Sequence, residues 1–417
     1  MNQIFIDDLA APKLNAAQQA ALNYARGLSI PLTIDSIMAE AQQSTGLSDW
    51  GDSAFTKRLQ LLCTEWDTDE GLTNLGRMSL RAKLLQHACS RLKINERFAK
   101  HPEIRDVELA PPIIVAGLPR SGTTHLLNLM AADTRFRSLP LWESYEPVAD
   151  EALYSSEPKG DPRYERCANA WQQMQVMTPH LAAMHPMDPD HIHEELELMG
   201  PNFGSYNYEW LSHSPRWRDH YYAEDQTYQY EYMRDVLKLL TWQDRQRGRG
   251  VKPWVLKCPQ HLEQLGPLKH VFPDATLAIT HRNPVDVIQS AVTMIAYGQR
   301  LNRRQVMMHE VLEYWVDRIE HLLRAAVNDR AIWPAAQSID IAFPALIKDQ
   351  LGYVERIYTL AGFTLDDAAR DQLTTFLNHH SDDYGRVVYD LQGQFGVSRE
   401  DLEKRFDFYF SAFSLEI

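Results

Sequence analysis

One short stretch of the chain has the residue types and spacing of an anion-binding loop. Residues 113–116 are apolar, the turn at 117–122 contains two glycines and a proline, and leucine and methionine recur at helical spacing over 126–130. A strand, a glycine-rich turn and a helix in this order direct backbone N–H groups and a helix N-terminus at a bound phosphate. The stretch therefore predicts a phosphate-binding loop.

This loop differs from that of nucleoside triphosphatases in the position of its cation. Gly117 and Gly122 keep the spacing of the G-x-x-x-x-G-K-[ST] motif, but Thr123 occupies the position of the lysine. The permanent cation lies within the loop instead, at Arg120, and Thr124 adds a second hydroxyl donor. We therefore expect the loop to bind phosphate without ordinary hydrolysis of ATP or GTP.

Two later strands are also expected to end in cations. A short apolar run ends at Lys257, and a second run, 275–280, is followed by Arg282. The carboxyl ends of parallel strands meet at one edge of a sheet, so these cations and Arg120 should lie together. Ser290 follows Arg282 by eight residues, in the first turns of the next helix. In a chain of net charge −14, three cations at one edge indicate a ligand with several phosphate-like groups.

Two side chains are candidates for a general base. Glu143 follows Trp142 beyond the loop helix and should return to the same edge of the sheet, where a partly apolar setting suits a base. As a solvated loop carboxylate it would have no such role. His185 is the second candidate, because histidine titrates near neutral pH.

Residues 150–250 differ in composition from the rest of the chain. They are rich in tyrosine and tryptophan, so an insert with aromatic walls could form the pocket for an acceptor molecule. The same aromatics at helical spacing are equally well explained as packed core. The residues His185, His191, His193 and Glu194 do not follow a specific metal-ligand spacing, and we expect no metal.

The elements that must position these residues are those of an α/β fold. Apolar runs alternate with helical patterns after residue 110, which predicts a central parallel sheet flanked by helices. Residues 1–110 have leucine at helical intervals and predict a helical N-terminal region, either a cap or an oligomerisation surface, which leaves a homodimer open. We expect residues 111–417 to form the domain that carries the loop, with 150–250 as its acceptor-pocket insert.

The C-terminal part of the chain is expected to complete the sheet. A further strand is predicted at 337–343 and an amphipathic helix at 345–361. The glycines within 384–410 predict an ordered loop that could fold over the bound phosphate-containing ligand.

The composition argues against several classes of protein. The chain has 417 residues, 44% hydrophobic and 24% charged, as in a globular protein with a large core. Its net charge of −14 argues against coating nucleic acid or anionic membrane. No run approaches the ~20 apolar residues of a membrane span, and the N-terminus lacks the pattern of a signal peptide. Four scattered cysteines are typical of reduced thiols, so we expect a cytoplasmic protein.

The motifs resemble those of a known enzyme family. The run P-P-I-I-V-A-G-L-P-R-S-G-T-T resembles the 5′-phosphosulfate loop of sulfotransferases that use PAPS (3′-phosphoadenosine 5′-phosphosulfate). The run H-R-N-P-V-D-V-I-Q-S resembles their 3′-phosphate motif, and V-L-K-C-P-Q-H-L and H-P-M are similar to segments of bacterial sulfotransferases. The likeness is strong over 111–145 and 252–300, and it is loose over the first 110 residues.

The resemblance implies transfer of a sulfuryl group from PAPS to a hydroxyl or amine, with PAP as product and no metal. Arg282 and Ser290 would hold the 3′-phosphate, which separates PAPS from ATP. Glu143 matches a catalytic glutamate of related enzymes, and Lys257 matches a lysine near the bridging oxygen. The residues that match the 5′-phosphosulfate loop are Arg120, Ser121, Gly122, Thr123 and Thr124.

The expected acceptor is a small molecule. The aromatic insert favours an apolar or aromatic alcohol, such as a phenol, a steroid or a lipid. A sugar or peptide hydroxyl remains open, because aromatic rings stack on sugars as readily as they line an apolar slot.

The sequence departs from the family at two points. Arg120 replaces the lysine of small-molecule cytosolic sulfotransferases, and arginine is not an equivalent proton donor. Phe343 and Pro344 replace a motif that often follows the fifth core strand. Two other classes are weighed against the enzyme: a P-loop small-molecule kinase, which the absent lysine disfavours, and an inactive nucleotide sensor, which the retained charged residues disfavour.

Overall fold

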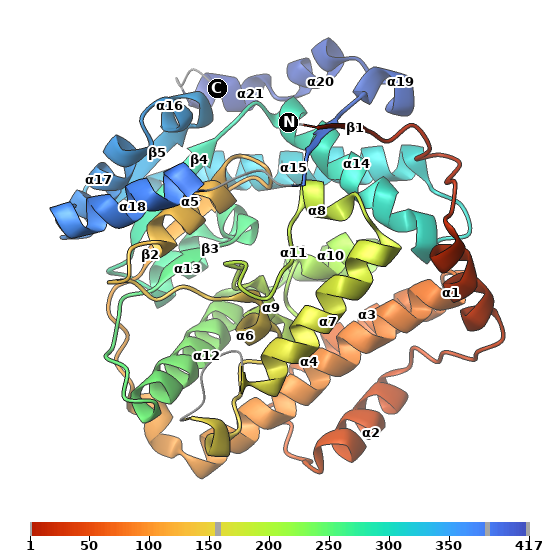
Figure 1. Ribbon diagram of the computed structural model, residues 1–417, viewed down its shortest axis with the longest axis horizontal. Coiled ribbons are helices and arrows are strands. Elements are labelled where there is room, and N and C mark those ends of the chain that lie inside the picture. The colour runs from red at the N-terminus through yellow and green to blue at the C-terminus, as the bar shows by residue number, and fades with distance from the viewer. Residues whose placement is uncertain (1, 155–159, 380–383, 414–417) are drawn as a thin grey trace.

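The centre of the molecule is a four-stranded parallel sheet (Figure 1). The computed structural model describes residues 2–154, 160–379 and 384–413. The strand order is β3–β2–β4–β5, with β3 at Val255–Lys257, β2 at Ile113–Gly117, β4 at Thr276–His281 and β5 at Ser338–Ala342. The predicted α/β fold with a parallel sheet flanked by helices is confirmed.

The register of the sheet brings three chain segments to one edge. Val115 of β2 pairs with Lys257 of β3 and with Ala278 of β4, and Gly117 pairs with Thr280. The loop after β2, the end of β3 and the residues after β4 therefore leave the sheet on the same side, as the sequence predicts.

Helices cover both faces of the sheet, which explains why β2 is buried throughout. Ile113 and Val115 pack with α5 (Thr123–Ala131) and α17 (Gln350–Leu360) on one face. Ile114 and Ala116 belong to the core on the other face, which includes α13 to α15. The remaining helices that border the sheet are α13 (Leu265–Val271), α14 (Pro284–Asn302), α15 (Met308–Asp329), α16 (Phe343–Lys348) and α18 (Asp367–His379).

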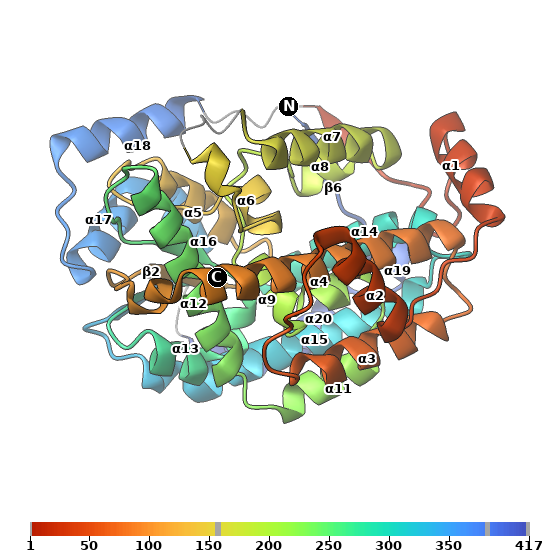
Figure 2. The same ribbon diagram turned by 90° about the horizontal axis from the view of Figure 1, so that it is seen from below.

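The predicted helix at 345–361 is divided into α16 and α17. Asp349 lies between them, and its carboxylate accepts a hydrogen bond from the Gly352 N–H at 3.1 Å, which caps α17. Helices α17 and α18 lie at the opposite end of the molecule from α1 (Figure 1 and Figure 2).

The N-terminal region consists mainly of helices that share a core with the insert. Arg58 and Arg91 donate hydrogen bonds to Asn202, and Trp66 donates to the Ser214 hydroxyl. The hydrophobic core of this region also contains buried aromatics from 203–221. The helices are α1 (Ala16–Arg26), α2 (Ile34–Thr45), α3 (Phe55–Asp67) and the long α4 (Asn74–Lys100).

The insert is mainly helical where the structure describes it, and several of its aromatic side chains are part of the hydrophobic core. Phe203, Tyr208, Trp217 and Tyr221 are fully buried against the N-terminal helices, as the packed-core interpretation expects. Helix α6 (Leu141–Tyr145) precedes the insert, whose helices are α7 (Pro162–Met177), α8 (Leu181–Met184), α9 (Leu196–Met199), α10 (Asn207–Leu211), α11 (Pro215–Ala223) and α12 (Thr227–Gln246). The 3-10 helices of the chain include η1 (Pro102–Asp106), η2 (Glu151–Leu153), η4 (Gly200–Asn202), η5 (Pro259–Glu263) and η6 (Arg330–Ile332).

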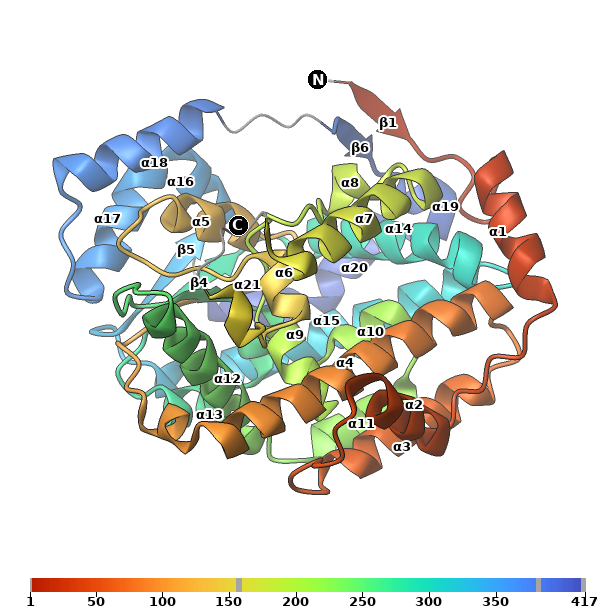
Figure 3. The ribbon, with the colours of Figure 1, turned by 60° about the horizontal axis from the view of Figure 1, so that its bottom comes forward.

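A second, two-stranded sheet joins the two ends of the described chain. β1 (Gln3–Phe5) pairs in parallel with β6 (Arg386–Val388), and the two lie side by side in Figure 3. Three helices follow β6: α19 (Leu391–Phe395), α20 (Arg399–Arg405) and α21 (Asp407–Ala412). The tail predicted as a loop is thus a strand followed by helices where the structure describes it.

The four cysteines are free thiols. Cys63, Cys167 and Cys258 are buried, each in a different hydrophobic cluster. Burial raises the pKa of Cys63 and of Cys167 to about 12, and it raises the pKa of Cys258 well above its ordinary value. Among the described helices, none is long and apolar enough to cross a membrane.

Candidate active site

The loop after β2 has an unusual backbone conformation. Gly122 has a φ of +89°, and Arg120 has a φ of 66° although it is not glycine. Such left-handed residues are uncommon and cluster at functional sites. Gly117 is also required by packing, since a Cβ there would lie 2.2 Å from the Thr280 hydroxyl. The loop is therefore built in a fixed shape at the end of β2.

Arg120 connects the two predicted phosphate motifs. Its Nε donates to the Ser290 hydroxyl on α14 at 3.2 Å, and its guanidinium donates to the Met184 carbonyl at 2.5 Å. Arg282 donates to the backbone carbonyl of Arg120 at 2.8 Å. The structure thus brings together three residues that lie up to 170 positions apart in the chain.

The other loop hydroxyls differ in availability. The Ser121 hydroxyl is buried and bonds to the Leu118 carbonyl at 2.6 Å and to Thr280 at 2.8 Å, so it stabilises the loop from within. Thr123 is also buried. Thr124 accepts a hydrogen bond from the Lys257 ammonium at 3.1 Å, which links the loop helix to the end of β3.

Lys257 has a carboxylate partner that sequence reasoning considered only as a metal ligand. Its ammonium forms a buried ion pair with Glu194. Its backbone N–H donates to Glu195 at 2.9 Å, and Glu195 also bonds to His261 at 2.6 Å. Burial raises the pKa of Glu194, and the neighbouring Lys257 opposes that rise. The two glutamates therefore hold the lysine at the edge of the sheet.

His185 lies next to the cations of the site. It follows α8 directly, and its ring centroid is 5.4 Å from that of His191 and 6.1 Å from that of His193. Burial lowers its pKa well below the ordinary value, and the two histidines, Lys257 and Arg120 lower it further. Its Nδ1 is buried and has no hydrogen-bond partner among the described residues. The imidazole is therefore neutral near pH 7 and has a free ring nitrogen.

Glu143 has a different set of contacts. Arg137 donates to its carboxylate at 2.5 Å and to Asp244 at 2.8 Å. These two carboxylates raise the pKa of Arg137 although its burial works to lower it. Within the described part of the chain, no hydrogen bond joins Glu143 to the loop, to Lys257 or to His185. Its role as a base stays a prediction.

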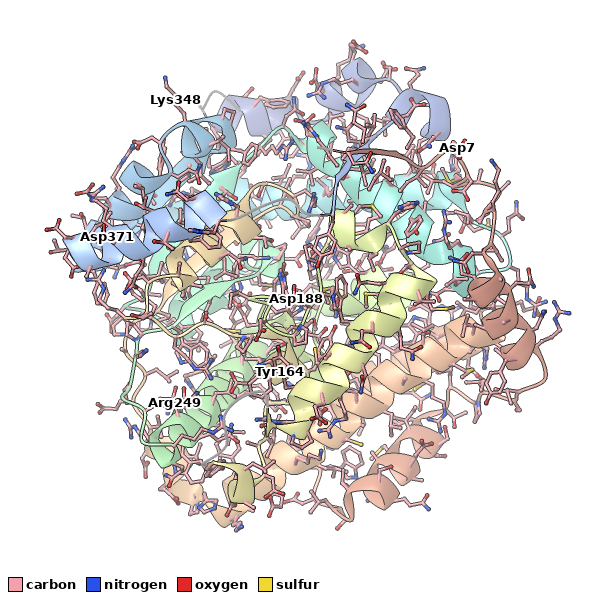
Figure 4. All side chains as sticks on the ribbon, in the orientation of Figure 1. Asp7, Tyr164, Asp188, Arg249, Lys348 and Asp371 are labelled. Carbon is pink, nitrogen blue, oxygen red and sulfur yellow. The ribbon has the colours of Figure 1, made fainter. Side chains whose placement is uncertain are left out.

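Apolar and aromatic side chains lie beside the histidines. Trp142, Tyr145, Tyr164 and Met187 belong to one cluster, and the Tyr145 ring is 6.3 Å from that of His193. Tyr164 on α7 and Asp188 in the loop after α8 are labelled near the middle of the molecule in Figure 4. Among the described residues, no group of three or more histidine, cysteine, aspartate or glutamate side chains is arranged to hold a metal ion.

Three further residues of the site were not found from the sequence. Glu194 pairs with Lys257 across 63 positions, Tyr389 accepts a hydrogen bond from Ser290 at 2.9 Å, and the Phe343 ring lies 4.6 Å from the Arg282 guanidinium. Each of these contacts joins residues that are distant in sequence, so the local spacing of residues does not predict it. The only available signals were the acidic pair at 194–195 and the aromatic residues near the end of the chain.

Comparison with known proteins assigns the chain to a family. The model of a protein family described as "Sulfotransferase family" matches residues 111–367. The chain therefore belongs to the sulfotransferase family. None of the curated proteins compared with the chain matches it.

Two solved structures are similar over almost their whole length. Sulfotransferase STF1 from Mycobacterium tuberculosis H37Rv is 28% identical, with a TM-score of 0.78 over 91% of this chain and 100% of that one. Sulfotransferase STF9 from Mycobacterium avium is 23% identical, with a TM-score of 0.80 over 93% of this chain and 98% of that one, and shows the shared fold. The similarity therefore includes the N-terminal helices as well as the sheet.

Proposed function

We propose that the protein transfers a sulfuryl group from PAPS to a hydroxyl of a small-molecule acceptor and releases PAP. The observation that carries the proposal is the hydrogen-bonded set of Arg120, Ser290 and Arg282, which joins the two phosphate motifs at one edge of the sheet. Membership of the sulfotransferase family supports the reaction class.

The residues at this edge suit a donor with two separated anionic groups. The 5′-phosphosulfate would be held by the loop Arg120, Ser121, Gly122, Thr123 and Thr124, and the 3′-phosphate by Arg282 and Ser290. Arg282 has only one described carboxylate partner, Asp286 at 3.6 Å, and lies over the Phe343 ring. Its charge is therefore only partly compensated, as an anion site requires.

Lys257 is the residue proposed to stabilise the group in transfer. Its ammonium contacts Thr124, at the start of the loop helix, so it lies beside the expected position of the sulfuryl oxygens. The ion pair with Glu194 fixes this position of the buried ammonium. Fixed cations and loop amides can stabilise the transition state without a metal.

His185 is favoured over Glu143 as the general base. The acceptor oxygen attacks sulfur while the bond from sulfur to the leaving phosphate oxygen breaks, and the acceptor proton must move to a nearby base. His185 is near Lys257 and Arg120, is neutral near pH 7 and has an unpaired Nδ1. The ion pair of Glu143 with Arg137 disfavours it for this task.

The surroundings of His185 support an apolar or aromatic acceptor. Tyr145, Tyr164 and Met187, which are only partly buried, offer ring faces and a thioether near the histidines. A phenol, a steroid or a lipid alcohol is the proposed acceptor, and a sugar or peptide hydroxyl is the alternative that the assay must examine. The proposed setting is the cytoplasm, where PAPS would be the donor.

The proposal is tested by incubating the protein with ³⁵S-labelled PAPS and separate phenol, steroid, fatty-alcohol, sugar and peptide acceptors. We expect labelled product with an apolar alcohol or phenol, and stoichiometric PAP. Lys257→Met should lose at least 10²-fold in rate, while Lys269→Met, a matched lysine on α13, should not.

A parallel incubation with ATP and Mg²⁺ examines the kinase alternative. Phosphorylated product there, without sulfated product from PAPS, would contradict the proposal. Turnover of neither donor by a protein that binds PAP would indicate an inactive nucleotide sensor instead.

A further inference from the structure

The C-terminal strand carries a tyrosine to the predicted 3′-phosphate site. Tyr389 directly follows β6, and its hydroxyl accepts a hydrogen bond from the Ser290 hydroxyl at 2.9 Å. Tyr389 is half-buried, whereas Ser290 is only 3% exposed. Tyr389 is thus the more accessible hydroxyl of the pair.

The hydrogen bonds around Ser290 run in one direction. Arg120 donates from Nε to Ser290, and Ser290 donates to Tyr389. The phenolic oxygen therefore accepts, and its own hydrogen can be donated elsewhere. No acceptor for that hydrogen is found in residues 2–154, 160–379 and 384–413. The Tyr389 O–H is the last hydrogen-bond donor in a series that starts at the Arg120 guanidinium. Such a donor is suited to binding an anion.

The position of Tyr389 depends on the opposite end of the described chain. Ile4 of β1 pairs with Val387 of β6, and the Gln394 side chain donates to the Ile6 carbonyl. Ile4, Ile6, Val387 and Tyr389 share one hydrophobic cluster, which also contains Met184. The carbonyl of Met184 accepts from Arg120, so the cluster contacts the loop as well. Figure 3 shows β1 beside β6, at the end of the molecule where α8 lies.

We propose that Tyr389 is a ligand of the donor's 3′-phosphate and that β1 is the element that positions it. The inference rests on the proposed function, because it assigns one more residue to the same donor site. The phenolic hydrogen is donated to a phosphate oxygen beside Ser290 and Arg282. Tyr389 thereby contributes to the discrimination between PAP and the same nucleotide without a 3′-phosphate.

The test is calorimetric binding of PAP and of 5′-AMP to wild-type protein and to Tyr389→Phe. We expect the variant to bind PAP roughly ten- to a hundredfold more weakly, because a hydrogen bond to a charged group is lost. Affinity for 5′-AMP should not change. Tyr297→Phe is the matched control, since Tyr297 lies in the same cluster but its hydroxyl accepts from the His180 N–H.

Two outcomes would overturn the inference and are distinguishable. Equal PAP affinity of wild type and Tyr389→Phe overturns the role of Tyr389 and leaves the proposed function intact. Wild-type protein that binds PAP no better than 5′-AMP overturns both. A loss of affinity for both nucleotides in Tyr389→Phe would show a structural role only, and it also overturns the inference.

A second pair of variants tests the role of β1. Ile4→Asp places a charge in the cluster, whereas Phe5→Asp changes the next residue of the strand, which is 67% exposed. We expect Ile4→Asp to reproduce the selective loss for PAP, with 5′-AMP binding retained, and Phe5→Asp to bind as wild type does. Unchanged PAP affinity in Ile4→Asp would show that β1 does not position Tyr389.

Discussion

At the residue scale, the roles of His185 and Glu143 are decided by their partners. Glu143 is one of two carboxylates that neutralise the buried Arg137, so its removal leaves a cation undercompensated. His185 has a ring nitrogen, Nδ1, without a hydrogen-bond partner among the described residues, and burial and the neighbouring histidines and cations lower its pKa. The two substitutions are therefore expected to affect different properties.

His185→Gln should lower kcat by about 10²–10⁴-fold, the usual contribution of a positioned general base, with PAP affinity retained. Glu143→Gln should instead lower stability by about 1–3 kcal/mol, with kcat within a few-fold of wild type. Steady-state kinetics and urea unfolding of both variants check this. The reverse pattern, a large loss of kcat in Glu143→Gln alone, would identify Glu143 as the base.

The pH dependence of kcat for the wild-type enzyme is a second test of His185 as the general base. Because the pKa of His185 lies well below its ordinary 6.5, the imidazole stays unprotonated from pH 8 down through 6.5. The acidic limb of kcat should therefore begin only below pH 6.5. A limb centred at or above 6.5 would contradict a buried, cation-flanked imidazole as the base.

The grouping of three predicted residues at one edge of the sheet could be predicted from the sequence. Arg120, Arg282 and Ser290 lie in local motifs whose strand and helix positions fix their location, and the structure brings them into hydrogen-bond contact. Glu194 and Tyr389 could not be predicted in the same way. The packing of the insert and of the C-terminal strand sets their positions. Hydrophobic periodicity within a short segment does not predict such packing.

At the scale of elements, the outer edge of the sheet is fixed by polar contacts around Asp340. His281, at the end of β4, donates to Asp340 of β5 at 2.9 Å, and Arg330 donates to the same carboxylate. His281 also bonds to the Tyr409 hydroxyl at 2.7 Å, which fastens α21 to the sheet. Arg282 follows directly, so this network sets where β4 ends.

Asp340→Asn should destabilise the protein by about 2 kcal/mol at pH 7. Burial works to raise the pKa of Asp340, but hydrogen bonds from His281 and Arg330 outweigh it and lower the pKa from its ordinary 3.8 to about 2. This stabilisation is present above pH 4 and is lost as the pH falls towards 2. Urea unfolding at several pH values measures it.

The control for this measurement is Asp371→Asn on α18, whose carboxylate is exposed (Figure 4). It should leave the stability and its acid dependence unchanged. The unfolding free energies of the wild type and of Asp340→Asn are compared between pH 4 and pH 2. If both fall by the same amount, the Asp340 network does not stabilise the fold.

Individual elements were predicted with uneven success, for physical reasons. The core strands were located because buried parallel strands are continuous apolar runs bounded by turns. β1 and β6 were not, because both are short and mostly exposed rather than buried apolar runs, and the two paired strands lie at opposite ends of the described chain. The division of 345–361 into two helices depends on a single capping aspartate, Asp349.

At the scale of the whole molecule, buried charges join segments that are distant in sequence. Arg318 of α15 forms ion pairs with Glu209 of α10 at 2.8 Å and with Glu263 of η5 at 2.6 Å, all fully buried. Tyr314 donates a further hydrogen bond to Glu209 at 2.6 Å. These contacts join α10 of the insert, η5 after β3 and α15 on one face of the sheet.

Arg318→Leu should lower the unfolding free energy by about 3–5 kcal/mol, because it leaves two buried carboxylates without their cation. Arg324→Leu on the same helix is the matched control, since the Arg324 side chain is exposed and its pair with Glu320 should contribute less than about 1 kcal/mol. Thermal or urea unfolding distinguishes the two. If Arg318→Leu costs no more than Arg324→Leu, the buried network does not stabilise the molecule.

The buried cysteines give this molecule three internal reporters of local opening. Cys63 lies in the N-terminal core, Cys167 beside the histidines and Cys258 behind the sheet, and each is protonated and shielded while its cluster stays closed. Thiol-reactive probes would therefore modify each one only at the rate at which its own surroundings unfold. Three different rates would mark three cooperative units, and one shared rate would mean that the protein opens as a whole.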